Sequence, residues 1–168
     1  MPPPKGREQS GRRSGGRREP SEYEEEVLQI DPVPRVVKGG RRLRFRDTVV
    51  IGNKKGRVGI GIGKSHEVVG AIQKAIHQAK KDLVTVPMKN GTIPHQVSVK
   101  FKSARILMMP AGPGTGVKAG GAVRKIAELA GIKNMMSKMF GARNRLTNAQ
   151  ATIIALKQLK AVSQQAKL

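Results

Sequence analysis

The chain contains no cysteine and no tryptophan, and it has only one tyrosine and three phenylalanines among 168 residues. The absence of cysteine excludes a disulfide framework and any metal site built on thiolates. The three histidines, His66, His77 and His95, lack the spacing and the carboxylate neighbours of a zinc site, so we expect no metal and no other cofactor. With so few aromatic residues, a core has to be built from Val, Ile, Leu, Met and Ala.

Long apolar runs are also missing. No segment approaches the roughly 18 apolar residues that span a bilayer, and the first residues lack the hydrophobic core of a secretory signal. We therefore expect a cytoplasmic protein with no membrane partner.

Acidic residues are scarce and scattered. Beyond the first 26 residues they are Asp31, Asp47, Glu67, Asp82 and Glu128, and no pair of them suits the roles of catalytic acid and base. An enzyme with a small-molecule substrate is therefore not expected.

Positive charge is the most abundant feature of the sequence. There are 33 lysines and arginines against 11 acidic residues, which gives a formal net charge of +22. A compact chain with this charge repels itself unless a polyanion offsets it. Phosphate backbones commonly do so, because neutralising them also releases condensed counterions. The expected partner is a nucleic acid.

The N-terminal part, residues 1–31, is predicted to be a basic extension. Its first 20 residues are rich in Pro, Gly, Ser and Arg, a composition that favours disorder in isolation. It is either a solubilising tail or an RNA-binding segment that becomes ordered on RNA. The acidic patch between positions 22 and 26 either opens a short helix or is simply solvated.

The next segment predicts two strands and a helix. In residues 42–51, apolar Leu43 and Phe45 alternate with arginines, which indicates a strand with one cationic face. After a turn at 53–56, residues 57–62 predict a second strand. Its glycines, Gly59 and Gly61, share one side and permit close approach by a packed helix.

A helix follows this second strand. Ser65 is expected to cap it, and Glu67 suits its positive end. The apolar residues recur at helical spacing, which predicts a core-facing stripe. They are Val68, Ile72, Ala75, Ile76, Ala79 and Leu83.

The second half predicts more strands and two helices. Strands are expected at 83–88, 97–101, 105–109 and 132–140, with a Pro/Gly loop at 110–116. One helix is expected at 120–130, ending at Gly131. Thr147 is expected to cap the last helix, whose apolar side carries Ile153, Leu156, Leu159 and Val162.

This order of elements predicts an α/β (α+β) protein with two small domains, 32–90 and 91–168, joined near residues 86–94.

Two glycine motifs resemble nucleotide loops and fail as such. The run Gly59–Ser65 ends in Gly-Lys-Ser, but Val58 stands where a phosphate loop needs its first glycine. The run Gly114–Ala119 fits a relaxed dinucleotide pattern, but no acid lies in 132–141, where the ribose ligand is expected. A tight glycine loop needed for packing or for contact with another backbone is the simpler interpretation of the second run. A nucleotide-dependent enzyme remains the least favoured class.

A basic glycine loop carries more information. In Val37-Lys38-Gly39-Gly40-Arg41, two glycines stand between two cations. The loop is either an ordinary basic hairpin turn or a loop that fits against folded RNA, where missing side chains allow close backbone approach.

From about Arg35 to Leu159, nearly without gaps, the sequence strongly resembles small-subunit ribosomal protein number five in its bacterial form. The motifs that carry the resemblance are Val37–Arg41, Gly56–Gly59, Gly61 with Gly63-Lys64, Ala71–Ala75, Asn90–Thr92 with His95, Pro110-Ala111, Gly114–Gly116, Ala119–Ala122 with Arg124, Gly131-Ile132 and Ala151–Ile153. Departures occur at Ile62, at Ser103-Ala104 and in the loop Gly141–Arg145.

The resemblance implies a domain like a double-stranded-RNA-binding module, followed by an α/β domain with a left-handed βαβ crossover. It implies binding to small-subunit ribosomal RNA at the junction of head and body, near messenger RNA, with an influence on translational accuracy. Ribosomal proteins four and eight of the same subunit are the implied partners. The loop matching Lys38, Gly39 and Gly40 lies at the spectinomycin site in that family, and Gly116 and Arg124 match its interface with protein four.

We therefore expect a structural constituent of the small ribosomal subunit. The alternative is a free-standing RNA chaperone or regulator that uses the same module. The expected RNA-binding residues are Lys38, Gly39, Gly40, Arg41, Arg42, Arg44, Lys54, Lys55, Arg57 and Lys64.

Overall fold

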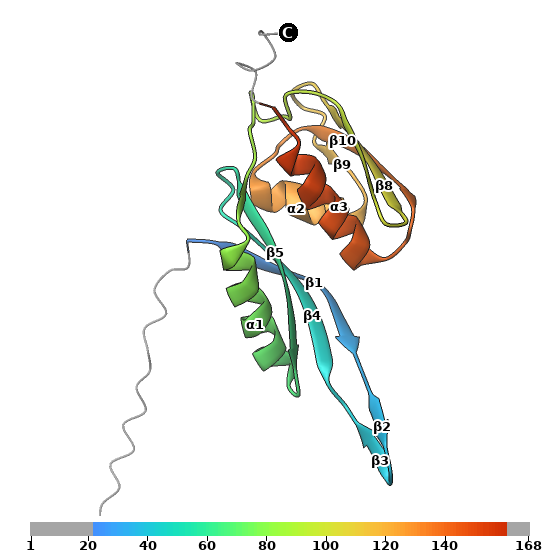
Figure 1. The fold of residues 1–168 in the computed structure, drawn as a ribbon. Helices are drawn as coiled ribbons and strands as arrows, with labels where there is room; N and C mark the ends of the chain where they lie inside the picture. The colour runs from blue at the N-terminus through green and yellow to red at the C-terminus, as the bar shows by residue number, and fades with distance from the viewer. Residues whose placement is uncertain (1–21, 161–168) are drawn as a thin grey trace, which may run out of the picture.

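The computed structural model describes residues 22–160 and shows two four-stranded sheets, a two-stranded ribbon and three helices (Figure 1). Both the arginine-rich segment 1–20 and Val162 lie outside the described residues. The first sheet has the order β1–β4–β5–β6, and the second has the order β7–β8–β10–β9. The α/β class and the two-unit organisation predicted from the sequence are confirmed.

The first sheet is antiparallel throughout. Its strands are β1 (Glu24–Pro32), β4 (Phe45–Gly52), β5 (Arg57–Ser65) and the short β6 (Val84–Thr85), which replaces the longer strand expected at 83–88. Val49 and Ile51 of β4 belong to the cluster that packs under the helix α1 (Val68–Lys81).

A narrow ribbon extends this sheet. β2 (Arg35–Val37) and β3 (Gly40–Arg42) pair only with each other, within the described residues. Val33 and Arg44 exchange backbone hydrogen bonds of 2.6 and 3.2 Å, which link the ribbon to the ends of β1 and β4. Figure 1 shows the ribbon projecting from the body of the molecule. We call residues 33–44 the arm. The single strand expected at 42–51 is thus interrupted at residues 43–44, where the arm joins β4.

Glycines of β5 allow α1 to lie directly on the sheet. Ala71, Ala75 and Ala79 of the helix are fully buried against it. A Cβ at Gly61 would overlap the carbonyl oxygen of Ala75, and one at Gly63 would overlap that of Ala71. The close helix approach predicted for the glycine face is confirmed.

Two predicted helix caps are wrong. Ser65 still pairs with Phe45 at the end of β5, so α1 begins later, and Glu67 is its N-cap. The last helix, α3 (Arg145–Lys157), is capped by Asn144, whose side-chain oxygen accepts a hydrogen bond from the Leu146 backbone N–H at 2.9 Å. Thr147, the expected cap, therefore lies inside the helix.

The acidic patch is neither helical nor merely solvated. It forms the start of β1, with Glu24 2.6 Å from Lys54 and Glu26 2.6 Å from Lys125. The predicted basic extension therefore needs correction for residues 24–31, because they belong to the first sheet. Backbone pairing with β4 places these residues in the sheet, and their charge partners also lie elsewhere in the chain, so local composition did not reveal the strand.

The second sheet lies beside the helices α2 (Gly121–Ala130) and α3. Its strands are β7 (Val97–Phe101), β8 (Ala104–Pro110), β9 (Val117–Lys118) and β10 (Met135–Gly141). β9 and β10 are parallel neighbours connected through α2, which forms a βαβ crossover. Its left-handedness stays a prediction. Gly131 ends α2 in the left-handed conformation, as expected.

Backbone hydrogen bonds join the two units. The Lys54 and Gly56 amides, in the turn between β4 and β5, donate to the carbonyls of Leu129 and Ala130 at 2.9 Å each. At Gly52 a Cβ would meet the Leu129 carbonyl, so only glycine fits this approach. Val50 and Val58 share one core with Ile126 and Leu156. The two units therefore pack around a continuous core.

Gly61→Ala tests the glycine contact. We expect it to lower the free energy of unfolding by about 2–4 kcal/mol, because the new methyl group displaces the α1 backbone. Gly112→Ala is the matched control, since nothing lies within 4 Å of its added Cβ. Urea unfolding of both variants measures the difference, and equal stability of the two would contradict the contact.

Candidate nucleic-acid interface

The arm carries the densest group of predicted RNA-binding residues. Lys38, Arg41, Arg42 and Arg44 are all exposed along it. Lys38 and Gly39 form the two-residue turn between β2 and β3, where Gly39 has φ +87°. That conformation favours glycine. No atom would contact a Cβ at Gly39 or Gly40, so the bare backbone of the tip is open to a partner.

The arm also exposes apolar side chains. Val36 is 75% exposed, and Val33 and Leu43 are more than 40% exposed. Exposed apolar side chains that lie together with cations mark a candidate interaction surface.

A second predicted group lies at the opposite end of the sheet. Lys54, Lys55 and Arg57 sit in or beside the turn between β4 and β5, and the length of β4 separates them from the arm by about 25 Å. Lys54 forms an ion pair with Glu24, and its backbone joins the second unit. The structure therefore does not unite the predicted residues in one patch.

Lys64 lies at the end of the first sheet that is nearest the arm. Its neighbour there, Arg46, was not among the residues selected from the sequence. Lys64 stands opposite Arg46 in the β4–β5 register. Arg46 forms a 2.8 Å ion pair with Asp31, and this hydrogen bond is the main cause that lowers the pKa of Asp31, against the opposing effect of burial. Arg46 continues the alternation of Arg42 and Arg44, and this alternation is the sequence signal that could have identified Arg46 as a site residue.

The two expected protein-contact residues lie on the β9–α2 segment. Gly116 has φ +72°, and nothing lies within 4 Å of its hypothetical Cβ. Arg124 is exposed on α2 and pairs with Glu128 at 2.8 Å. Both residues therefore face outward.

The glycine motifs do not form nucleotide loops. Gly59, Gly61 and Gly63 lie within β5 and against α1, so packing explains them. Gly114 and Gly116 adopt positive φ angles in the turn before β9. Among residues 22–160, no three His, Cys, Asp or Glu side chains gather where they could hold a metal. In the same range, no helix has the length and apolar character to cross a membrane.

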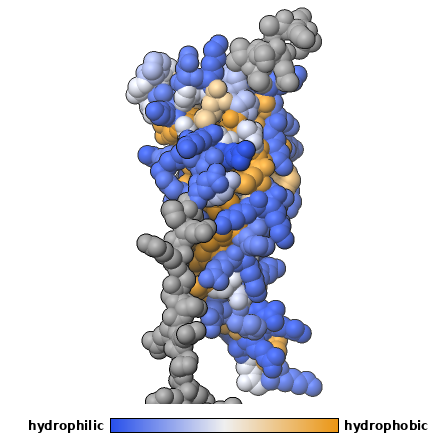
Figure 2. Space-filling view, turned by 90° about the vertical axis from the view of Figure 1, so that its left-hand side faces the viewer, coloured by the Kyte–Doolittle hydropathy of each residue, from blue (hydrophilic) through white to orange (hydrophobic). Residues whose placement is uncertain are grey.

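The surface is not uniformly polar. In Figure 2, apolar side chains reach the surface about midway along the molecule, with hydrophilic ones above and below. A groove of about 490 Å³ lies between β5 and α3, with Ile60, Ile62 and Ile153 in its wall.

Comparison with known proteins decides the family. Residues 23–87 match the family model described as ribosomal protein S5, N-terminal domain, and residues 99–168 match that of the S5 C-terminal domain. This chain belongs to the ribosomal protein S5 family.

Relatives named small ribosomal subunit protein uS5 support this membership. The protein of Thermotoga neapolitana is 50% identical over 88% of this chain and 83% of its own length. That of Nostoc punctiforme is 44% identical over 95% of this chain and 92% of its own length. A relative named uS5c from Spinacia oleracea is 49% identical over 86% of this chain, which spans only 47% of that relative.

The S5 fold of this chain buries the Asp47 carboxylate. Asp47 of β4 is fully buried, and neither of its side-chain oxygens accepts a hydrogen bond from residues 22–160. It lies opposite Gly63, on the face of the sheet that α1 covers. Burial, assisted by repulsion from Asp31, raises the pKa of Asp47. The charged carboxylate therefore destabilises the folded state.

Asp47→Ala should stabilise the protein at neutral pH. The folded state holds the Asp47 proton more tightly than the unfolded chain does, so stability falls as the pH rises from 3.8 through the raised pKa. Removing the carboxylate should add about 1–2 kcal/mol at pH 7 and less at pH 3, where both states are protonated. Urea unfolding at the two pH values measures this.

Glu25→Ala, which removes an exposed carboxylate from the neighbouring strand, is the control and should change stability by less than about 0.5 kcal/mol. A loss of stability in the Asp47 variant at pH 7 would show that the carboxylate is favourable where it lies.

Proposed function

We propose that this chain is a structural, RNA-binding component of the small ribosomal subunit. The observation that supports this most directly is the arm, whose exposed cations flank a glycine tip with an open backbone. Because the chain belongs to the ribosomal protein S5 family, ribosomal RNA is the polyanion that these cations bind in this proposal. The mechanism is positional, since no chemical step is needed.

The arm makes the primary RNA contact in this proposal. Lys38, Arg41, Arg42 and Arg44 hold phosphates, which fixes the register of the protein on the RNA without reading much sequence. Gly39 and Gly40 allow the sugar-phosphate surface to approach the backbone. Contacts with 2′-hydroxyls and the shape of the folded RNA favour RNA over DNA.

The other predicted cations form separate contacts. Lys64 extends the arm surface along β5. Lys55 and Arg57 are exposed at the far end of the sheet and reach a different RNA segment. Lys54 contributes less, because Glu24 already offsets its charge. A protein that holds two RNA segments apart suits a place between subdomains of a folded RNA.

The finer placement follows the family resemblance. The chain lies at the junction of head and body near messenger RNA, and it supports translational accuracy. It contacts ribosomal proteins four and eight, with Gly116 and Arg124 facing protein four. The outward positions of these two residues support that contact. No observation favours the alternative of a free-standing RNA chaperone.

Arg41→Ala/Arg42→Ala tests the arm. We expect affinity for deproteinised small-subunit ribosomal RNA to fall by about tenfold to a hundredfold, because two charged hydrogen-bonding groups are lost. Filter binding at fixed salt measures it. The fold should be unaffected, since both side chains are exposed.

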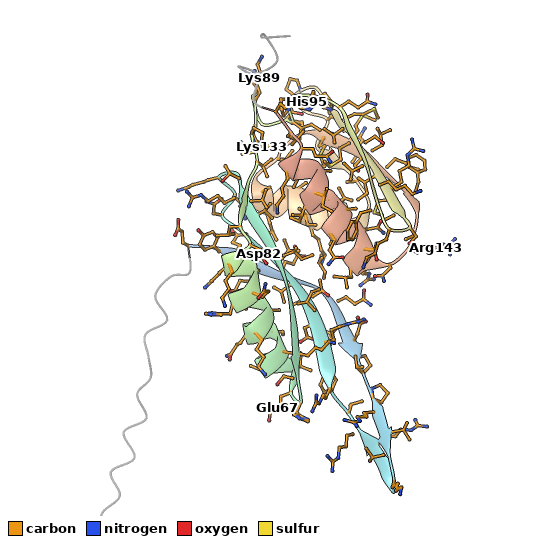
Figure 3. The ribbon with its side chains drawn as sticks, in the orientation of Figure 1. Glu67, Asp82, Lys89, His95, Lys133 and Arg143 are labelled. Carbon is orange, nitrogen blue, oxygen red and sulfur yellow. The ribbon has the colours of Figure 1, made fainter. Side chains whose placement is uncertain are left out.

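Lys89→Ala/Lys133→Ala is the matched control. It removes the same charge at the end of the molecule opposite the arm (Figure 3). If both double variants lose the same affinity, the arm has no special role and only net charge matters.

A further inference from the structure

A polar pocket opens between the two units, beside the base of the arm. It has a volume of about 530 Å³. Gln29, Asp31 and Arg46 line it from β1 and β4, and Arg143 and Arg145 line it from the start of α3. Arg143, just before α3, and Arg145, its first residue, lie about a hundred positions from Arg46 in the sequence, so folding alone brings the three guanidinium groups to one cavity.

Positive charge in this pocket exceeds negative charge. Asp31 is its one carboxylate, and that group is already engaged by Arg46 and Gln29. Arg145 donates one hydrogen bond, of 3.2 Å, to the Leu28 carbonyl. Arg143 is exposed and makes no hydrogen bond or ion pair within residues 22–160. Two of the three guanidinium groups therefore lack a counter-charge.

An unpaired donor lies beside these groups. The Nε of Arg46 is buried and has no hydrogen-bond acceptor in the described chain. A buried donor without a partner costs free energy, which an acceptor from outside the chain would recover.

We propose that this pocket binds a backbone phosphate of the ribosomal RNA, held by Arg46, Arg143 and Arg145. Guanidinium groups match the geometry of phosphate oxygens and donate in pairs, which is why arginine suits such a site. The N-terminal end of α3 is not the source of the phosphate affinity, because the Asn144 side chain already caps its first turn. This inference rests on the proposed function and adds a contact to it.

The position of the pocket favours RNA over an acidic peptide as the occupant. Arg42 and Arg44 of the arm lead along the chain to Arg46 in the pocket wall. Figure 3 places Arg143 on the outer side of the molecule, above the arm. A single RNA strand that follows the arm can therefore reach the pocket. Its phosphate would link β4 to α3 and so bridge the two units.

Arg143→Ala in the full chain tests the pocket, since this side chain has no partner whose loss would disturb the fold. Affinity for deproteinised small-subunit ribosomal RNA should fall about threefold to tenfold, and the matched control Lys133→Ala should stay within twofold of the unaltered chain. Equal affinities for the two variants would overturn the pocket assignment. If the unaltered chain itself does not bind this RNA, the proposed function fails as well.

A tethered probe distinguishes RNA from protein as the occupant. Because the chain has no cysteine, Arg143→Cys creates a unique attachment point for iron–EDTA. In reconstituted small subunits, the hydroxyl radicals released there should cut ribosomal RNA within one short stretch. Cleavage of a neighbouring protein without cleavage of RNA would assign the pocket to an acidic peptide and overturn the inference.

Discussion

The contact between the backbone of β5 and helix α1 constrains the rest of the structure. Because Gly59, Gly61 and Gly63 have no side chains, the carbonyl oxygens of the helix lie where Cβ atoms would otherwise be. One face of the first sheet is thereby closed at short range. Long cationic side chains cannot occupy that face, so they are confined to the sheet ends, the arm and the face that meets the second unit.

Charge pairing then decides which cations remain available. The acids of β1 offset Lys54 and Lys125, and both pairs lie where chain segments meet. Such exposed pairs add little stability individually. Their main effect is to determine which cations stay unpaired, so that the cations of the arm and Arg143 remain available to an external anion. The shared core and the backbone bonds from Lys54 and Gly56 hold these groups in fixed relation.

Local patterns predicted most of the elements, and the motifs of the resemblance predicted the family, whereas long-range pairing escaped both. The alternation in β5 and the helical period in α1 are encoded within each segment, and both elements form. The predicted stripe of α1 needs two corrections, because Leu83 lies beyond the end of the helix at Lys81 and the buried Ala71 was not part of it. The acidic patch was misread because its partners, Lys54 and Lys125, lie far along the chain. The cap at Ser65 failed because strand pairing with Phe45 competed with it. Arg46 and Arg143 are likewise far apart in the sequence, so sequence alone could not place them in one pocket.

The central claim is that exposed lysines and arginines, mounted on this shared-core scaffold, hold phosphates of ribosomal RNA. The dependence of RNA affinity on salt tests it most directly. The logarithm of the affinity of the intact chain for small-subunit ribosomal RNA should fall linearly with the logarithm of salt concentration, losing about 0.7–0.9 in slope for each phosphate held. An affinity that stays flat between low and moderate salt would contradict the account.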